Sequence, residues 1–174
     1  QTCALPISQR GHAIELRVYA EDPTRDDLPA PGPLLLYREP SRPGVRVDSG
    51  VGEGGEVSVH YDPLIAKLVV TADTREAARR RALETLGEFP ILGVQTNVAL
   101  LGAILRHPRF VSGQLDTRLL ETEGAVLRAE SAPAQPSPNV LAIASAARRL
   151  PSARTAAASS AGQDPWDTLR GARG

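Results

Sequence analysis

The sequence is poor in several residue types that particular classes of protein require. Its 174 residues include one cysteine, no methionine and six aromatic residues, and Lys67 is the only lysine beside 19 arginines. The single cysteine, Cys3, excludes an internal disulfide framework and any zinc or iron–sulfur site built from clustered cysteines. A core must therefore be built from Val, Leu, Ile and Ala, and burying aliphatic surface at about 25 cal/mol per Å² can stabilise a domain of about 110 residues.

The chain also lacks an excess of charge and any long apolar run. Its 20 basic and 20 acidic residues cancel, so the composition gives no general case for a nucleic acid or an anionic membrane as partner. No run approaches the roughly 18 apolar residues of a membrane-spanning helix, and no signal peptide is visible at the N-terminus. We therefore expect a protein of the cytosol or an organelle lumen, and the missing initiator methionine suggests a processed or partial chain.

Composition divides the chain into two parts near residue 123. Residues 1–123 hold 14 basic and 17 acidic groups, whereas residues 124–174 hold six basic and three acidic groups and are rich in Ala, Ser and Pro. We expect a folded domain over residues 11–123. Residues 124–174 are expected to form a linker, centred on 128–138, and a partly disordered or helical tail with one short helix at 140–150.

The hydrophobic pattern predicts strands first and helices afterwards. Alternating or β-branched segments predict strands at residues 12–19, 34–37, 45–49, 56–60 and 65–70, the last of them central, and a short extended piece at 113–120. Apolar residues at helical spacing predict helices at 73–89 and 97–106, the first with a capping box formed by Asp73 and Glu76 and the second capped by Thr96 or Asn97. This order favours an α+β fold, with a small, mainly antiparallel sheet and two packed helices.

Most of the motifs that suggest chemistry have a simpler structural explanation. Gly50, Gly52 and Gly55 match the dinucleotide-binding pattern G-x-G-x-x-G, but a strand and not a helix follows, so we expect a hairpin connection. The histidines, His12, His60 and His107, show no metal-ligand spacing, and His107 most simply ends a helix.

The basic run at residues 79–81 is expected to be a solvated helix face balanced by Glu76 and Glu84. Asp62 is expected to cap a turn, and Lys67 to pair with an acid. None of these residues requires a catalytic role.

Arg46 differs because it lies in the middle of a predicted strand, between two valines and beside a glycine-rich loop. A strand holds an arginine more rigidly than a loop does, and a guanidinium stays charged and offers a planar fork of donors. Composition alone favours a salt bridge to Asp48 or Glu56 over an anion-handling role. Both interpretations remain open at this point.

Five segments, in order, resemble the C-terminal domain of biotin carboxylases: residues 11–23, 44–50, 56–68, 93–97 and 107–110. The resemblance covers about residues 11–121, and residues 58–63 look most like the biotin-bearing α subunits of acyl-CoA carboxylases, 3-methylcrotonyl-CoA carboxylase in particular. Residues 165–167 resemble the short sequence that opens the region after the carboxylase domain in such subunits.

The resemblance implies an ATP-dependent ligase reaction. ATP with magnesium activates bicarbonate as carboxyphosphate, and the carboxyl group passes to biotin on a carrier domain for use by a carboxyltransferase subunit. The resemblance places Arg46 at bicarbonate and the biotin ureido oxygen, as a catalytic and cofactor-binding residue, and this reverses the preference for a simple salt bridge. It implies no metal ligand among these residues, a homo-oligomeric parent enzyme, and a cytoplasmic (bacterial) or mitochondrial-matrix location.

The departures from the family are equally informative. The family's ATP-binding portion should precede Gly11, and residues 1–10 match it poorly. Lys67 lies in a predicted strand, so it can serve neither as the biotin-bearing lysine nor as a nucleotide lysine. We expect a fragment that is inactive alone. The alternatives are a non-catalytic assembly or binding module that keeps this fold and, from the glycine pattern, an unrelated NAD enzyme.

Overall fold

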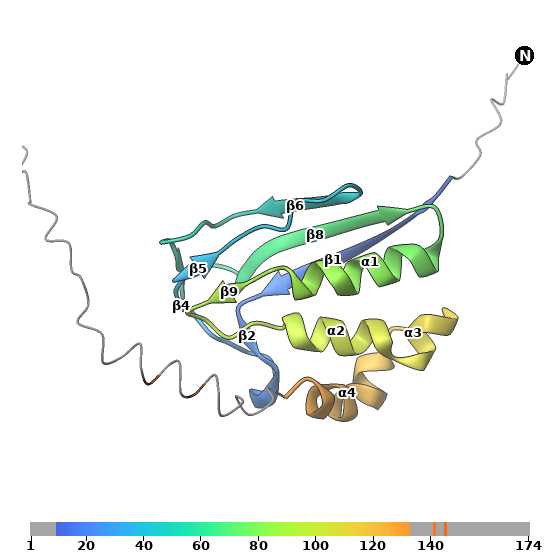
Figure 1. The fold of residues 1–174 in the computed structure, drawn as a ribbon. Helices are drawn as coiled ribbons and strands as arrows, with labels where there is room; N and C mark the ends of the chain where they lie inside the picture. Colours follow the sequence, from blue (N-terminus) through green and yellow to red (C-terminus); the bar gives the residue numbers. More distant parts are fainter. Residues whose placement is uncertain (1–9, 133–140, 142–144, 146–174) are drawn as a thin grey trace, which may run out of the picture. The chain divides into compact units, whose positions relative to one another are not determined.

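A three-stranded antiparallel sheet in the order β1–β8–β6 organises the domain (Figure 1). The structure is a computed structural model, and it describes residues 10–132, 141 and 145. The elements of the described residues are β1 (His12–Tyr19), β2 (Glu21–Asp22), the 3₁₀ helix η1 (Pro23–Arg25), β3 (Leu28–Pro29), β4 (Gly32–Pro33), β5 (Leu36–Tyr37), β6 (Val45–Ser49), β7 (Glu56–Val57), β8 (Leu64–Ala72), α1 (Arg75–Gly87), β9 (Ile91–Leu92), α2 (Val98–Arg106), α3 (Pro108–Ser112) and α4 (Leu119–Glu130).

The strand β8 lies in the centre of the sheet, and all its residues except Lys67 and Thr71 are apolar. It pairs with β1 along eight residues and with β6 along five, with Leu68 opposite both Leu16 and Val47. The predicted central strand at 65–70 is thus confirmed. Smaller antiparallel pairs join β2 to β3, β4 to β7, and β5 to β9.

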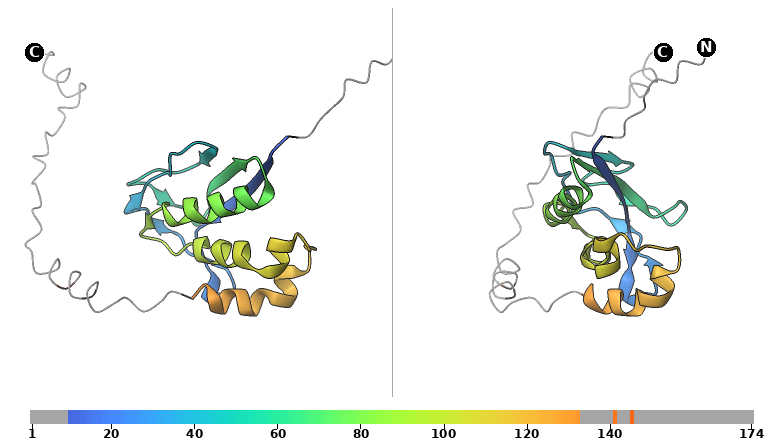
Figure 2. Two further views of the ribbon diagram at one scale, coloured as in Figure 1. Left: turned by 45° about the vertical axis from the view of Figure 1, so that its right-hand side comes forward. Right: turned by 90° about the vertical axis from the view of Figure 1, so that its right-hand side faces the viewer.

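Helices α1 to α4 lie on one side of this sheet, and the views of Figure 2 agree on this layering. The helix α1 packs on β1 and β8 through its small and apolar face, α2 packs against α1, and α4 packs against α2. The main core cluster consists of Ile14, Leu16, Leu68, Val70, Ala78, Ala82, Leu86 and Leu105. The predicted α+β class and the two predicted helices are confirmed.

The helix α4 corrects the expectation for the end of the domain. Residues 119–120 are helical, not extended, and the helix runs past 124, where the linker region was expected to begin. Leu127 is fully buried against Leu100 and Ala103 of α2, and this burial stabilises a segment whose composition alone favours a linker. At Gly124 of this helix, the Arg128 guanidinium lies where a side chain would point, with Nη1 2.8 Å from an ideal Cβ.

Helix capping also differs in detail from the sequence prediction. The N-cap of α1 is Thr74, whose hydroxyl accepts a hydrogen bond from the Ala77 amide, and not Asp73. Asn97 occupies the N-cap position of α2, but its side chain makes no capping hydrogen bond. His107 ends α2, as expected.

The glycine-rich connection at 50–55 is not a hairpin. It leads from β6 to β7, and these two strands do not pair with each other. The strand β7 pairs with β4, and next to this pair Leu34 exchanges backbone hydrogen bonds with Gly54 and Gly55. A strand follows it, so the helix that a dinucleotide fingerprint needs is missing there. The predictions for residues 1–9, for 165–167 and for most of 133–150 fall outside the described residues. Among the described residues, no helix is long and apolar enough to cross a membrane.

Candidate functional site

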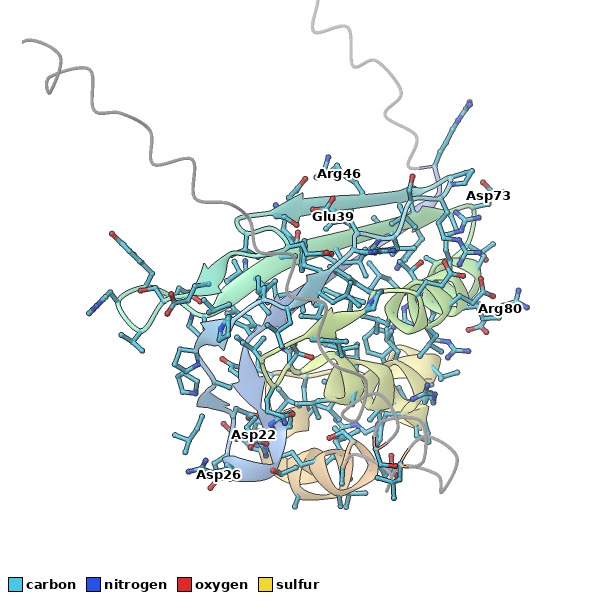
Figure 3. All side chains as sticks on the ribbon, turned by 60° about the vertical axis from the view of Figure 1, so that its left-hand side comes forward. Asp22, Asp26, Glu39, Arg46, Asp73 and Arg80 are labelled. Atoms are coloured by element: carbon cyan, nitrogen blue, oxygen red, sulfur yellow. The ribbon has the colours of Figure 1, made fainter. Side chains whose placement is uncertain are left out.

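Arg46 lies on the face of the sheet that no helix covers. Along β6, Val45 and Val47 pack onto the core, so the alternation of a strand turns Arg46 and Asp48 to the opposite face. Figure 3 shows Arg46 projecting from the sheet on the side away from the helices. Its side chain is 68% exposed.

Strand register assembles charged residues around Arg46 in two rows across the sheet. Arg46 and Glu15 both lie opposite Val69, and Asp48 and Arg17 both lie opposite Lys67. Side chains directly opposite each other on one face lie close enough to interact. The uncovered face therefore presents three cations and two carboxylates, a net charge of +1.

Asp48 is shared between two of the cations. Its Oδ1 atom lies 3.2 Å from Arg46 Nε, and its Oδ2 atom lies 3.3 Å from Lys67 Nζ. This confirms the expected salt bridge of Arg46 to Asp48 and the expected pairing of Lys67 with an acid, whereas Glu56 lies in β7, in a different sheet. Arg46 is thus ion-paired through Nε and still largely exposed, so the ion pair leaves room for a second partner.

A small hollow adjoins the Arg46 side chain. It has a volume of about 190 Å³ and is lined by Gly44, Val45, Arg46, Val69 and Thr71. Gly44 has φ +76°, and an added Cβ would lie 2.7 Å from the Thr71 carbonyl oxygen, so a side chain there would disturb the start of β6. A second hollow of about 440 Å³, lined by residues 10–13, 71 and 72, shares Thr71 with the first.

The far end of β6 is held by an aromatic pair. The Tyr37 hydroxyl contacts the Ser49 hydroxyl, and the Tyr37 ring packs edge-on against Phe89, with ring centroids 5.4 Å apart. Burial raises the pKa of Tyr37 above its usual value of 10.0, so this phenol stays neutral at physiological pH. The strand that carries Arg46 is therefore fixed at both ends.

The other candidate residues have structural environments. In the basic run, Arg79 is bound by Glu76 and by the Leu105 carbonyl, and Arg81 donates to the Thr71 carbonyl, so only Arg80 is a solvated residue as predicted. Glu84 pairs with Arg42 outside the run. Asp62 accepts from the Leu64 amide and caps its turn, as expected. The described residues contain no group of three His, Cys, Asp or Glu that could hold a metal, and Cys3 lies outside them.

Asn97 is a structural residue whose partners the sequence does not reveal. Its Oδ1 accepts from the Tyr19 amide at 3.0 Å, and its Nδ2 donates to the Arg17 carbonyl at 3.1 Å. The side chain thereby attaches the start of α2 to the end of β1. Nearby, residues 93–96 line a larger hollow of about 680 Å³, together with residues of η1, β9 and α2.

Comparison with known proteins identifies the family of this domain. Residues 15–122 match the family model of the biotin carboxylase C-terminal domain. The chain is 37% identical over 175 residues to the methylcrotonoyl-CoA carboxylase subunit alpha of Dictyostelium discoideum, covering 97% of this chain and 25% of the relative. It is 45% identical over 116 residues to the human propionyl-CoA carboxylase alpha chain, covering 66% of this chain and 16% of the relative.

Solved structures give the same answer. The biotin carboxylase domain dimer of the Hydrogenobacter thermophilus 2-oxoglutarate carboxylase, in complex with MgADP, ADP and bicarbonate, matches with a TM-score of 0.65 and 37% identity, covering 71% of this chain and 28% of that chain. This chain therefore spans between about a sixth and a little over a quarter of the length of these three relatives.

Proposed function

The chain belongs to the family of biotin carboxylase C-terminal domains, and from this membership we propose that it forms one domain of the biotin carboxylase part of an acyl-CoA carboxylase. The enzyme that contains the domain is then a biotin-dependent ligase. It carboxylates biotin on a carrier domain at the expense of ATP, and a carboxyltransferase partner passes the carboxyl group to the acyl-CoA.

The complex of the Hydrogenobacter relative with MgADP and bicarbonate supports ATP, magnesium and bicarbonate as reactants of this enzyme. The family resemblance places the nucleotide and magnesium in the ATP-binding portion, so we assign them to another portion of the enzyme. The dimeric relative supports a homo-oligomer. The two named acyl-CoA carboxylase relatives are mitochondrial, and we expect the same matrix location for a eukaryotic enzyme and the cytoplasm for a bacterial one.

We assign Arg46 as the catalytic residue of this domain, in contact with bicarbonate and with the biotin ureido group. Biotin, when bound, supplies the nitrogen that accepts the carboxyl group. Asp48 occupies the Nε side of the Arg46 guanidinium, and the side chain is still 68% exposed. The Nη atoms of Arg46 can therefore donate hydrogen bonds to an oxygen of bicarbonate or of the biotin ureido group. A guanidinium held there stabilises an oxygen on which negative charge develops more strongly than the neutral starting group.

The single observation that carries this assignment is the exposed, ion-paired Arg46 on an uncovered sheet face beside a hollow of about 190 Å³. Bicarbonate is a small planar anion, which suits a planar fork of donors in a shallow hollow. The residues that line the hollow include no carboxylate, and the nearby carboxylate of Asp48 is paired with Arg46 and Lys67.

The test places residues 11–132, which include all of β1 and α4, in a methylcrotonoyl-CoA carboxylase α subunit in place of the biotin carboxylase C-terminal domain of that subunit. We expect this enzyme to carboxylate its biotin with ATP and bicarbonate, and Arg46→Lys to lower kcat about 100-fold, because an ammonium keeps the charge but not the planar fork. Arg80→Lys is the matched control, since Arg80 is 67% exposed and lies on α1, away from the uncovered face.

Near-normal turnover by the Arg46→Lys enzyme, at an unchanged melting temperature, would contradict the assignment. That result would favour the alternative of a domain that serves assembly without taking part in the chemistry. Equal losses of activity in the Arg46→Lys and Arg80→Lys enzymes would mean that an arginine-to-lysine substitution lowers activity at either position. That result would also contradict a specific catalytic role of Arg46.

A further inference from the structure

We propose that Asp48 is a positioning residue for Arg46 and that Lys67 in turn holds Asp48, an inference that rests on the catalytic role proposed above for Arg46. The three residues come from two neighbouring strands and share the uncovered face of the sheet. Asp48 lies two residues after Arg46 on β6, and Lys67 lies directly opposite Asp48 on β8.

The geometry gives each oxygen of the Asp48 carboxylate its own cation. Oδ1 lies 3.2 Å from Arg46 Nε, and Oδ2 lies 3.3 Å from Lys67 Nζ. A carboxylate bound at both oxygens cannot rotate freely about its last bond. Asp48 therefore holds the Nε side of the Arg46 guanidinium in one direction.

An exposed arginine without such a support would sample many side-chain conformations. A catalytic group acts best when its direction is fixed before the reaction, because ordering it later costs free energy at the transition state. With Nε engaged by Asp48, the outer edge of the guanidinium, formed by Nη1 and Nη2, is the part that a planar anion can approach. The ion pair thus directs the fork of donors toward the place of the substrate.

Lys67 has a second effect, on charge. A carboxylate next to an anion site would repel bicarbonate, and Lys67 balances Asp48 so that the triad keeps a net charge of +1. This gives the only lysine of the chain a specific use. Lys67 is 37% exposed and Asp48 43%, so the charges act through partly screened contacts, at short range.

The same face provides a matched control pair. Glu15 and Arg17 are also two residues apart on one strand, β1, and Glu15 Oε1 lies 3.5 Å from Arg17 Nε. Arg17 is 63% and Glu15 46% exposed, close to the values of Arg46 and Asp48. Glu15→Gln thus removes a similar carboxylate from the same face without touching Arg46.

The first experiment observes the Arg46 Nε–Hε group by ¹⁵N NMR in the 174-residue chain, with the signal assigned by its loss in Arg46→Lys. We expect Asp48→Asn to lower the order parameter of this group and to speed exchange of its Hε proton several-fold, and Lys67→Met to do so to a smaller degree. Glu15→Gln should leave the Arg46 signal unchanged. An Arg46 signal as ordered in Asp48→Asn as in the parent chain would overturn the proposal, whatever the activity of the enzyme.

The second experiment measures the domain-exchanged carboxylase described above. Asp48→Asn should lower kcat about 10-fold with a small change in the KM for bicarbonate, as expected for lost positioning. Lys67→Met should raise that KM and Lys67→Arg should restore it, whereas Glu15→Gln should keep the kcat of the parent enzyme.

The two inferences fail in different ways. If Arg46→Lys keeps full activity, the catalytic role of Arg46 is wrong, and with it the purpose of the triad. If Arg46→Lys is impaired but Asp48→Asn has the kcat of the Glu15→Gln enzyme, Arg46 is catalytic and the positioning role of Asp48 is wrong.

Discussion

Asn97 shows how a single buried amide can connect elements that are distant in sequence. It is 8% exposed, and it pairs with the Tyr19 amide and the Arg17 carbonyl, about 80 residues away, as another strand residue would. Both backbone groups lie at the end of β1, where the register with β8 shifts. Without Asn97 they would lack a partner in a partly buried position, which costs more than a surface hydrogen bond. The residue thus holds α2 to the sheet and completes the end of β1.

Glu21 is expected to make folding depend on pH. Burial, reinforced by Asp27 and Asp62, raises its pKa above the usual 4.5. The folded state therefore binds this proton more tightly than the unfolded state, and stability falls as pH rises from 4.5 through the folded-state pKa. We expect Glu21→Gln to increase the free energy of unfolding more at pH 7 than at pH 4. Urea denaturation of both proteins at both pH values measures this difference.

Glu39→Gln is the control for Glu21→Gln, because Glu39 is an exposed carboxylate of a loop. A gain for Glu21→Gln that is the same at pH 4 and pH 7 would contradict the account, since it would not arise from the carboxylate charge.

At the scale of elements, α1 is joined to α2 by Arg79, which the sequence alone does not distinguish from the other two arginines of the run 79–81. Arg79 donates hydrogen bonds to both carboxylate oxygens of Glu76, each at 2.7 Å, and its Nη1 donates to the Leu105 carbonyl of α2 at 3.0 Å. Its side chain is only 13% exposed, against 67% for Arg80. The pair therefore holds α1 to α2, whereas Arg80 is a solvated residue.

We expect this link to weaken in acid. The bidentate hydrogen bonds from Arg79 lower the pKa of Glu76 below the usual 4.5. The stabilisation is therefore fully present above pH 4.5 and is lost as pH falls through the folded-state pKa. Glu76→Gln should lower the melting temperature at pH 7, and the gap to the parent chain should close as pH falls below 4.5.

Glu121→Gln is the control for this measurement, because Glu121 lies in the first turn of α4 as Glu76 does in α1. If the two variants lose stability equally, the effect belongs to the helix N-terminus and not to the pair with Arg79.

Local patterns predict the elements well and the contacts between them poorly. The strand β8 and the buried face of α1 follow from spacing within one segment, and the pair of Arg46 with Asp48 follows from alternation along one strand. The sequence could say only that Lys67 meets an acid, because the register of β6 against β8 is set by the whole sheet. The sequence did not predict the helix α4, because Leu127 stabilises it only through burial against α2, a contact that the local pattern does not show.

At the scale of the whole molecule, α4 completes the domain. Leu127 is fully buried against α2, and Arg128 is ion-paired with Asp27, next to η1. Asp27 has φ +56°, a conformation that a non-glycine residue adopts at a cost. The ion pair on Asp27 and the packing of Leu127 together fix the loop after η1 and the last described helix to each other.

Leu127→Ala should lower the free energy of unfolding by about 2–5 kcal/mol, because a fully buried leucine leaves a cavity between helices. Far-UV circular dichroism in urea measures the loss, and a single transition is expected if α4 unfolds with the rest of the domain. Val126→Ala, at a 54% exposed neighbouring position, should change little. Similar small losses for both variants would show that α4 contributes little to the stability of the domain.

The connectivity of the sheet has a consequence for the time course of folding. The central strand pairs with β1 across some fifty intervening residues, and the contact of Arg128 with Asp27 joins positions 101 residues apart. Folding rates fall as the sequence separation of native contacts grows, because long loops must close before those contacts can form. During synthesis β1 therefore cannot begin to pair with β8 until Leu64 has left the ribosome, its pairing is complete only with Ala72, and the domain is complete only when α4 has followed. Of the strands of this sheet, β1 is thus the one that stays exposed for the longest part of synthesis.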